Sequence, residues 1–231
     1  MPREKNGNTR SSLSRYGEEA FDLEEEEEII EDDETLEEIE EEESRKAKVI
    51  DGALVLSIEE ISPKSALKKI RSHIKVYKNY ETVMNRRTTD KAFRLNTAHY
   101  LTITNDILKE IHAMLIEKQL MSAWAIGERL IGEIDLTIRD LEKGDYGFTT
   151  FFENPKLLAI DLSQLYLLDY DLIETLIIMR KSVESFDSMV KQDLLDDVDL
   201  WLESIDRLVG RVIRLAEDRG KLIASYERIS Y

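Results

Sequence analysis

The side chains that could bind a metal ion or transfer a proton are few and scattered along the chain. Its 231 residues include no cysteine and three histidines, which are His73, His99 and His112. His99 and His112 are thirteen positions apart, which on one helix places them about 140° apart around the axis. The histidines therefore do not converge on a shared ion. The absence of cysteine excludes disulfides and thiolate zinc sites.

Four aspartates lie close together late in the chain: Asp193, Asp196, Asp197 and Asp199. A calcium-binding loop needs the pattern Asp-x-Asp-x-Asp-Gly followed by a distal glutamate, and this segment has neither. Carboxylates also suit the first turns of a helix, where they interact favourably with the helix dipole. We therefore interpret the four aspartates as the beginning of a helix and predict no metal site and no cofactor.

Motifs of common enzyme classes are missing as well. The sequence has no phosphate-binding loop, no Gly-x-Gly-x-x-Gly and no Gly-x-Ser-x-Gly. Its Glu110-Ile111-His112 run differs from the Glu-x-x-His pattern of di-iron helical bundles. These observations predict a protein that is not an enzyme.

Charge divides the chain into two unlike parts. The formal net charge is −17, and residues 1–43 hold nineteen acidic and four basic side chains. Between Glu18 and Glu43, 18 of 26 residues are Asp or Glu and none is Lys or Arg. Self-repulsion at this density predicts a disordered acidic arm over residues 1–44. In the linker that follows, residues 45–61, an Asp51-Gly52 pair between two β-prone runs predicts a short β-hairpin.

A basic segment follows this linker. Residues 64–94 contain ten basic and two acidic side chains. One interpretation is the solvated face of a helix. The other is a surface that binds a polyanion or the acidic arm, with Tyr77, Tyr80 and His73 available to stack on bases. The candidate residues are Lys68, Lys69, Arg71, Lys75, Lys78, Arg86 and Arg87.

Residues 62–231 have the composition and periodicity of an all-α helical bundle. We expect a helix from a Ser62-Pro63 start past Tyr80, with Leu67, Ile70, Ile74, Tyr77 and Met84 on its inner face. A turn over residues 85–90 would precede a second helix over residues 91–120. A third helix would begin at Ser122 as its cap and end at Gly144.

The C-terminal half is richer in apolar side chains. The loop over residues 144–155 carries four aromatic residues, which either plug the end of the bundle or anchor a partner. The segment over residues 157–179 is apolar on nearly every side, so it is either central or faces another subunit. Residues 194–226 follow a heptad pattern that only Arg219 interrupts, which predicts a helix of about 35 residues.

Two functional hypotheses follow from this pattern. The first is a non-catalytic interaction or scaffolding protein that binds a protein partner or forms a homo-oligomer, with the acidic arm as a regulatory tether. The second is a nucleic-acid-associated protein whose basic segment is autoinhibited by the arm. No apolar run approaches the ~20 residues of a membrane helix, so we expect a cytoplasmic protein without membrane contact. The candidate protein-interface residues are Phe148, Phe151, Phe152, Leu172, Trp201 and Leu208.

Overall fold

The computed structural model describes residues 49–50, 53–54, 61–157 and 159–226. The predicted acidic arm lies outside these residues. Within the linker, strands β1 (Val49–Ile50) and β2 (Ala53–Leu54) pair antiparallel, with Val49 opposite Leu54. Residues 51 and 52, on which the hairpin prediction rests, lie outside the described residues, so that turn stays a prediction.

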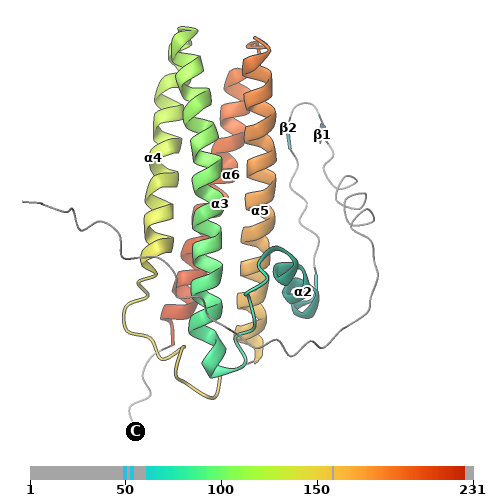
Figure 1. Cartoon of the computed structure of the whole chain (residues 1–231), viewed down its shortest axis with the longest axis vertical. Helices are drawn as coiled ribbons and strands as arrows, with labels where there is room; N and C mark the ends of the chain where they lie inside the picture. The colour runs from blue at the N-terminus through green and yellow to red at the C-terminus, as the bar shows by residue number, and fades with distance from the viewer. Residues whose placement is uncertain (1–48, 51–52, 55–60, 158, 227–231) are drawn as a thin grey trace, which may run out of the picture. The chain divides into compact units, whose positions relative to one another are not determined.

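The described residues from 61 onward fold into five helices. They are α2 (Pro63–His73), α3 (Val83–Glu117), α4 (Met121–Lys143), α5 (Ala159–Lys191) and α6 (Val198–Ala224). The four long helices lie side by side as a bundle (Figure 1). The prediction of a helical bundle is confirmed. No helix among the described residues is long and apolar enough to span a membrane.

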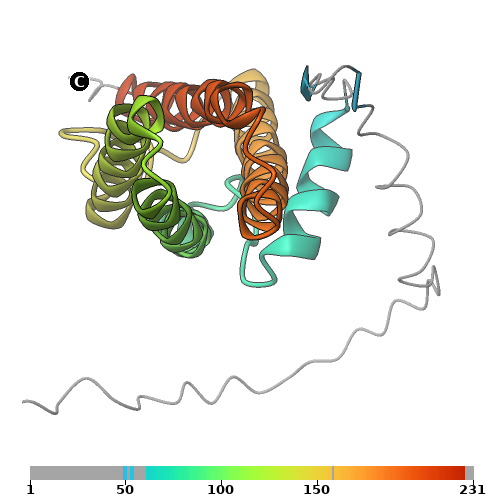
Figure 2. The same ribbon diagram turned by 90° about the horizontal axis from the view of Figure 1, so that it is seen from above.

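Each long helix packs against two of the others. Helix α3 contacts α4 and α5, and α6 contacts the same two, so α3 and α6 are diagonal to each other. Figure 2 shows this ring of four helices from above, with α2 on the outer side of α5. Helix α5 is therefore covered on three sides, by α2, α3 and α6. This coverage is the reason that its sequence is apolar all round, as expected for a central helix.

The first helix begins as predicted and ends earlier than predicted. The hydroxyl of Ser62 accepts a hydrogen bond from the backbone N–H of Ser65, and Pro63 occupies the first turn. The helix ends at His73, and the guanidinium Nε of Arg71 then donates to the carbonyl of Lys78 at 2.9 Å. This bond holds the chain after α2 in a compact non-helical segment. Continuation of the helix past Tyr80 is therefore a wrong prediction.

The predicted turn over residues 85–90 is also wrong, because α3 begins at Val83. Several inward positions of its first turns are polar, and this hid the helical period in the sequence. Met84, predicted on an inner face, is 87% exposed. Steps of four or three residues connect a buried row along α3: Arg86, Asp90, Phe93, Thr97, Leu101, Thr104, Leu108, Ile111 and Leu115.

The remaining boundaries differ less from the sequence predictions. Helix α4 begins at Met121, one residue before the predicted cap Ser122, and stops at Gly144 in the left-handed conformation (φ 57°). The last helix has 27 residues rather than about 35, because its expected first turn, including Leu194, belongs to the connection from α5. Three of the four aspartates lie in or at the end of that connection, and Asp199 lies in the first turn of α6.

Removing a buried leucine from α5 should destabilise the fold strongly. Leu172 has no exposed surface, whereas Leu136 on α4 is 56% exposed. We expect Leu172→Ala to lower the free energy of unfolding by about 2–5 kcal/mol, because it leaves a cavity in the core. The matched change Leu136→Ala should cost less than about 0.5 kcal/mol. Urea unfolding followed by circular dichroism measures both, and equal losses would contradict a central position for α5.

Candidate functional site

The residue that interrupts the heptad pattern of α6 is the centre of a buried ion network. Arg219 is only 1% exposed. Its Nε donates to Oδ1 of Asp169 on α5 at 2.6 Å, and its Nη2 lies 2.9 Å from Oδ1 of Asp90 on α3. The guanidinium also lies over the ring of Phe93, with Cζ 4.6 Å from the ring centroid. Arg219 thus reaches across the bundle and links α6 to both α5 and the diagonal helix α3.

Three tyrosine hydroxyls complete the network. Tyr77 and Tyr80 donate to Oδ2 of Asp169 at 2.7 and 2.9 Å. Tyr146 donates to Oδ1 of Asp90 at 2.7 Å. Tyr80 and Tyr146 in turn accept hydrogen bonds from the Arg219 guanidinium at 2.8 and 2.7 Å. The two buried carboxylates, from α3 and α5, therefore accept hydrogen bonds or pair with groups from α6 and from two connecting segments.

Arg94 extends the network to the end of α4. Its Nε donates to Oδ2 of Asp90 at 2.9 Å, and its Nη1 donates to the carbonyl of Leu141 at 2.6 Å. A Cβ at Gly144 would lie 2.2 Å from Cζ of Arg94, so another residue there would displace the guanidinium in addition to adopting a positive φ. Glycine at the left-handed end of α4 thus leaves room for Arg94 beside Asp90.

Arg86 is a second buried cation, and it is held by backbone carbonyls. Its Nε donates to the carbonyl of Tyr80 at 2.6 Å, and its Nη1 donates to that of Phe151 at 2.8 Å. Burial lowers the pKa of this guanidinium. The predicted membership of Arg86 in a surface that binds polyanions is therefore wrong, because its donors already face protein carbonyls inside the bundle.

The surroundings of the network set the protonation of its acids and phenols. Burial raises the pKa of Asp90, but Arg219, Tyr146 and Arg94 outweigh it, so that the pKa lies below its usual value. Burial raises the pKa of Tyr77 and Tyr80 well above the usual value, and that of Tyr146 to about 12. Burial raises the pKa of Asp169, and Arg219 together with the hydrogen bonds from Tyr77 and Tyr80 opposes this rise. The tyrosines therefore stay neutral and donate to the two carboxyl groups. Each carboxylate oxygen of Asp90 and Asp169 already accepts a hydrogen bond. This arrangement is suited to stabilising the packing of the helices.

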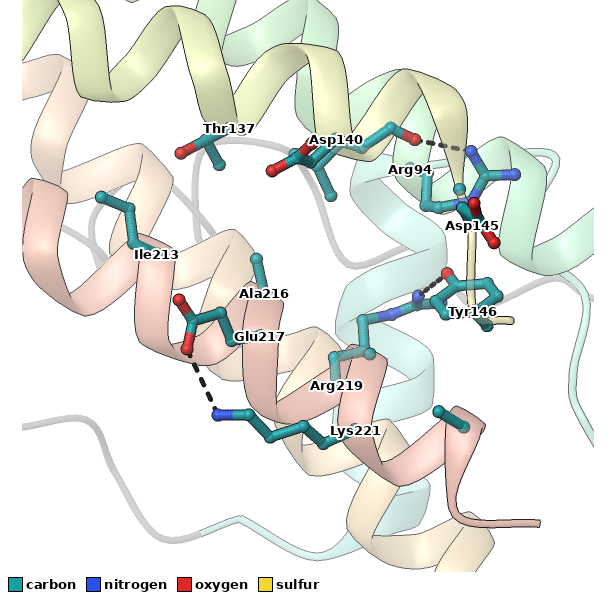
Figure 3. Close-up of a pocket in the computed structure, with 14 residues that line it drawn as sticks. Arg94, Thr137, Asp140, Asp145, Tyr146, Ile213, Ala216, Glu217, Arg219 and Lys221 are labelled. Carbon is teal, nitrogen blue, oxygen red and sulfur yellow. Dashed lines mark hydrogen bonds and ion pairs between the residues drawn. The ribbon is translucent and has the colours of Figure 1, made fainter. Parts of the chain in front are cut away.

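A cavity of about 360 Å³ lies beside the network, between the C-terminal halves of α4 and α6 (Figure 3). Arg94, Tyr146 and Arg219 line it together with charged residues of both helices. On the α6 wall Glu217 pairs with Lys221 at 3.2 Å. Small residues at a spacing of four leave this space open on α6: Ala216, Gly220 and Ala224. Within the described residues, no three His, Asp or Glu side chains gather as a metal ion would require.

The predicted basic surface is partly retained. Lys68, Arg71, Lys75 and Lys78 are exposed on or just after α2, and Lys69 is half-buried, with its Nζ 3.4 Å from the hydroxyl of Tyr170. Arg87 is exposed on α3 and pairs with Glu153 at 3.1 Å. Tyr77 and Tyr80, expected to stack on bases, are buried in the network instead, so that expectation is wrong.

Most of the predicted interface residues belong to the core of this chain. Phe151, Phe152, Leu172 and Leu208 are buried. Trp201 is half-buried and stacks on Phe186 with ring centroids 6.0 Å apart. Of the loop aromatics, Phe151 and Phe152 close the end of the bundle, whereas Phe148 is exposed. The four buried side chains are therefore not presented to a partner in this structure.

A different apolar surface was missed by the sequence reasoning. It lies where α3 turns into α4 and α5 turns into α6, at the end of the bundle opposite the network, the upper end in Figure 1. We call it the turn end. Its exposed apolar side chains are Ile116, Met121, Trp124, Leu194 and Leu200. The sequence gives only a weak indication of the turn end, because each of the five residues continues the apolar pattern of a helix. The positions of the two turns in the structure place all five outside the core.

Comparison of the chain with protein-family models, with curated proteins and with solved structures finds no match. The functional inference therefore rests on the geometry of the chain itself.

Removing the central cation should cost far more stability than removing an exposed one. Arg219→Met would leave Asp90 and Asp169 buried without their main counter-charge, so we expect a loss of about 3–5 kcal/mol. Arg207→Met on the same helix removes an exposed pair with Glu203 and should cost less than about 1 kcal/mol. Chemical denaturation measures both losses. A double-mutant comparison checks the interaction between Arg219 and Asp169. Asp169→Asn should lower the free energy of unfolding less in the Arg219→Met background than in the wild-type protein.

The buried tyrosines should make the protein sensitive to alkali. Unfolded tyrosines ionise near pH 10, and the three network tyrosines resist ionisation in the fold. Above about pH 10 the unfolded state therefore binds fewer protons than the folded state. Stability is then lost as pH rises from about 10 through about 12, at roughly 1.4 kcal/mol per pH unit for each such tyrosine.

Tyrosinate absorbance against pH tests this expectation. Part of the signal from the nine tyrosines should appear late and together with the loss of helicity. The same titration in denaturant should show one step near pH 10. A single step near pH 10 in the folded protein, with helicity intact, would be the contrary result.

Proposed function

We propose that this chain is a non-catalytic interaction protein, a rigid helical bundle that binds a protein partner at its turn end. The observation that carries the proposal is the group of five exposed apolar side chains gathered at that end. Exposed apolar groups that cluster on one face are typical of interaction sites, whereas single ones are ordinary.

The continuity of the turn end supports this proposal. At the network end, Phe151 and Phe152 are buried, while Met84, Phe148 and Ile160 are exposed on three separate elements. At the turn end, an ion pair between Lys118 and Asp193 links the two helical connections, and the Ser122 hydroxyl lies 3.5 Å from Oδ1 of Asp199. The two turns therefore form one continuous surface. A surface that is ordered before binding loses less entropy when a partner docks.

The proposal extends to self-association and to regulation by the acidic arm. The heptad positions of α6 face the core of this chain at Ile205, Leu208 and Val212, which are all buried. A homo-oligomer would therefore use the turn end rather than the heptad pattern. The arm, with its 18 acidic residues between Glu18 and Glu43, would act as a charged tether.

A second candidate function is the binding of a polyanion such as nucleic acid at α2. The supporting observation is a row of exposed basic residues at steps of four and three, in a stretch, residues 61–80, that contains no Asp or Glu. The row consists of Lys64, Lys68 and Arg71 on α2 and of Lys75 and Lys78 in the non-helical segment that follows it. Under this candidate, the acidic arm would compete with the polyanion, and binding would fall steeply with salt.

Affinity capture from the native cell tests the proposed function, with and without nuclease. Leu200→Gln changes an apolar residue at the turn end, and Leu136→Gln changes one of equal exposure, 56%, on α4 away from it. We expect Leu200→Gln to remove the captured partner and Leu136→Gln to retain it, because only the former lies in the interface. Both variants should keep the wild-type helicity.

The same capture distinguishes the second candidate. A captured set that disappears on nuclease treatment and is indifferent to Leu200→Gln would favour binding of nucleic acid at α2. In that event, deletion of residues 1–43 should increase binding, and Lys68→Gln with Lys75→Gln should decrease it.

A further inference from the structure

The apolar residues of the turn end alternate with acidic ones. Residues 191–200 contain four aspartates and one lysine, a net charge of −3. Leu194 lies between Asp193 and Asp196, and Leu200 directly follows Asp199. Asp196 and Asp197 are exposed. The end thus combines an apolar surface with a fixed negative charge next to it.

The basic residues near this end are already engaged. Lys118 pairs with Asp193, and Lys191 pairs with Asp187 at 2.6 Å. Asp196 and Asp197 lie where the connection enters α6, at a helix N-terminus that partly offsets their charge. The negative potential that remains is directed to solvent beside Leu194 and Leu200. A partner that covers these leucines must therefore approach the aspartates.

We propose that the turn end binds a basic amphipathic segment of a partner protein, whose apolar side chains cover the five exposed residues and whose Lys or Arg side chains lie against Asp196, Asp197 and Asp199. This inference rests on the proposed function and names the chemistry of the partner. An acidic segment would be repelled, and an uncharged one would leave the aspartates partly desolvated without a partner.

A second copy of the chain is the competing occupant. The basic row on α2 is a surface of opposite charge on the same bundle, so copies could associate head to tail. The exposed apolar residues that accompany the row are few, Val76 and Met84 among them. The apolar part of the turn end would then be poorly covered. A separate partner with its own apolar stripe fits both features of the surface.

Two synthetic amphipathic helical peptides test the proposal on the full chain. They share one stripe of Leu and Trp, and the polar face carries Lys in one and Gln in the other. Fluorescence anisotropy should show that the Lys peptide binds at least about tenfold more tightly than the Gln peptide, with an affinity that falls as salt rises and screens the charges. Asp196→Asn with Asp197→Asn should reduce the affinity for the Lys peptide about tenfold.

A matched charge control is necessary because the whole chain carries −17 and attracts cations in general. Asp140→Asn with Asp218→Asn removes two exposed charges near the opposite end of the bundle. This control should leave binding of the Lys peptide within about twofold of wild type. Equal losses in the two double variants would mean general attraction and would overturn the proposal.

The remaining outcomes separate this inference from the proposed function. If the Lys and Gln peptides bind equally and Leu194→Gln with Leu200→Gln abolishes both, the turn end is an interface and the charge inference is wrong. If neither leucine substitution changes binding of the peptides, the proposed function fails too. If light scattering without peptide shows assemblies that Asp197→Asn and Lys68→Gln each dissolve, the occupant is a second copy, and the inference is again overturned.

Discussion

The buried guanidinium of Arg219 is the constraint on which the rest of the structure depends. A cation in the interior of a bundle is tolerated only when carboxylates and further hydrogen bonds replace its water. Asp169 supplies one carboxylate from the neighbouring helix α5, and Asp90 supplies the other from the diagonal helix α3. The two carboxylates have more acceptor capacity than one arginine fills, and three tyrosines and Arg94 donate to the remainder. The network fixes the relative positions of three long helices.

The same network explains the irregular segments of the chain. Tyr77 and Tyr80 both donate to one oxygen of Asp169, and the chain leaves the helical path after His73 so that both can. Tyr146 comes from the loop after α4, whose left-handed Gly144 leaves room for Arg94. A buried polar network also favours one arrangement of helices over others of similar apolar packing, which is its best-attested use.

The buried ion network lies at one end of the bundle, so the two ends differ in the side chains that they contain. The network end has buried aromatic and charged side chains, with Met84, Phe148 and Ile160 exposed on separate elements. The turn end has short connections, five exposed apolar residues and a local excess of aspartate. A third surface, the basic row on α2, lies on the outer helix beside α5. The buried network therefore stabilises the fold, and the turn end and the basic row are the surfaces on which the proposed functions rest.

The sequence by itself determined the features that depend on local pattern. Apolar periodicity established an all-α bundle, Ser62 and Pro63 determined where α2 begins, and Gly144 determined where α4 ends. Lys68 and Arg71 of the predicted basic segment are exposed on α2, while Lys75 and Lys78 are exposed after the helix ends. The wrong boundaries arose where polar residues face inward, as Arg86 and Asp90 do at the start of α3.

Only the tertiary structure decided the network and the turn end. Arg219 interrupts a heptad pattern in the sequence, and nothing near Asp169 in the sequence marks it as buried. Apart from Arg94, which is four positions from Asp90, the partners in the network are 50 or more positions apart in the chain. The energy that makes a buried charge acceptable comes from those distant groups, and local spacing carries no record of them. Likewise, Met121, Leu194 and Leu200 resemble core residues in sequence. They are exposed because the helices end there and no other element of the described residues covers them.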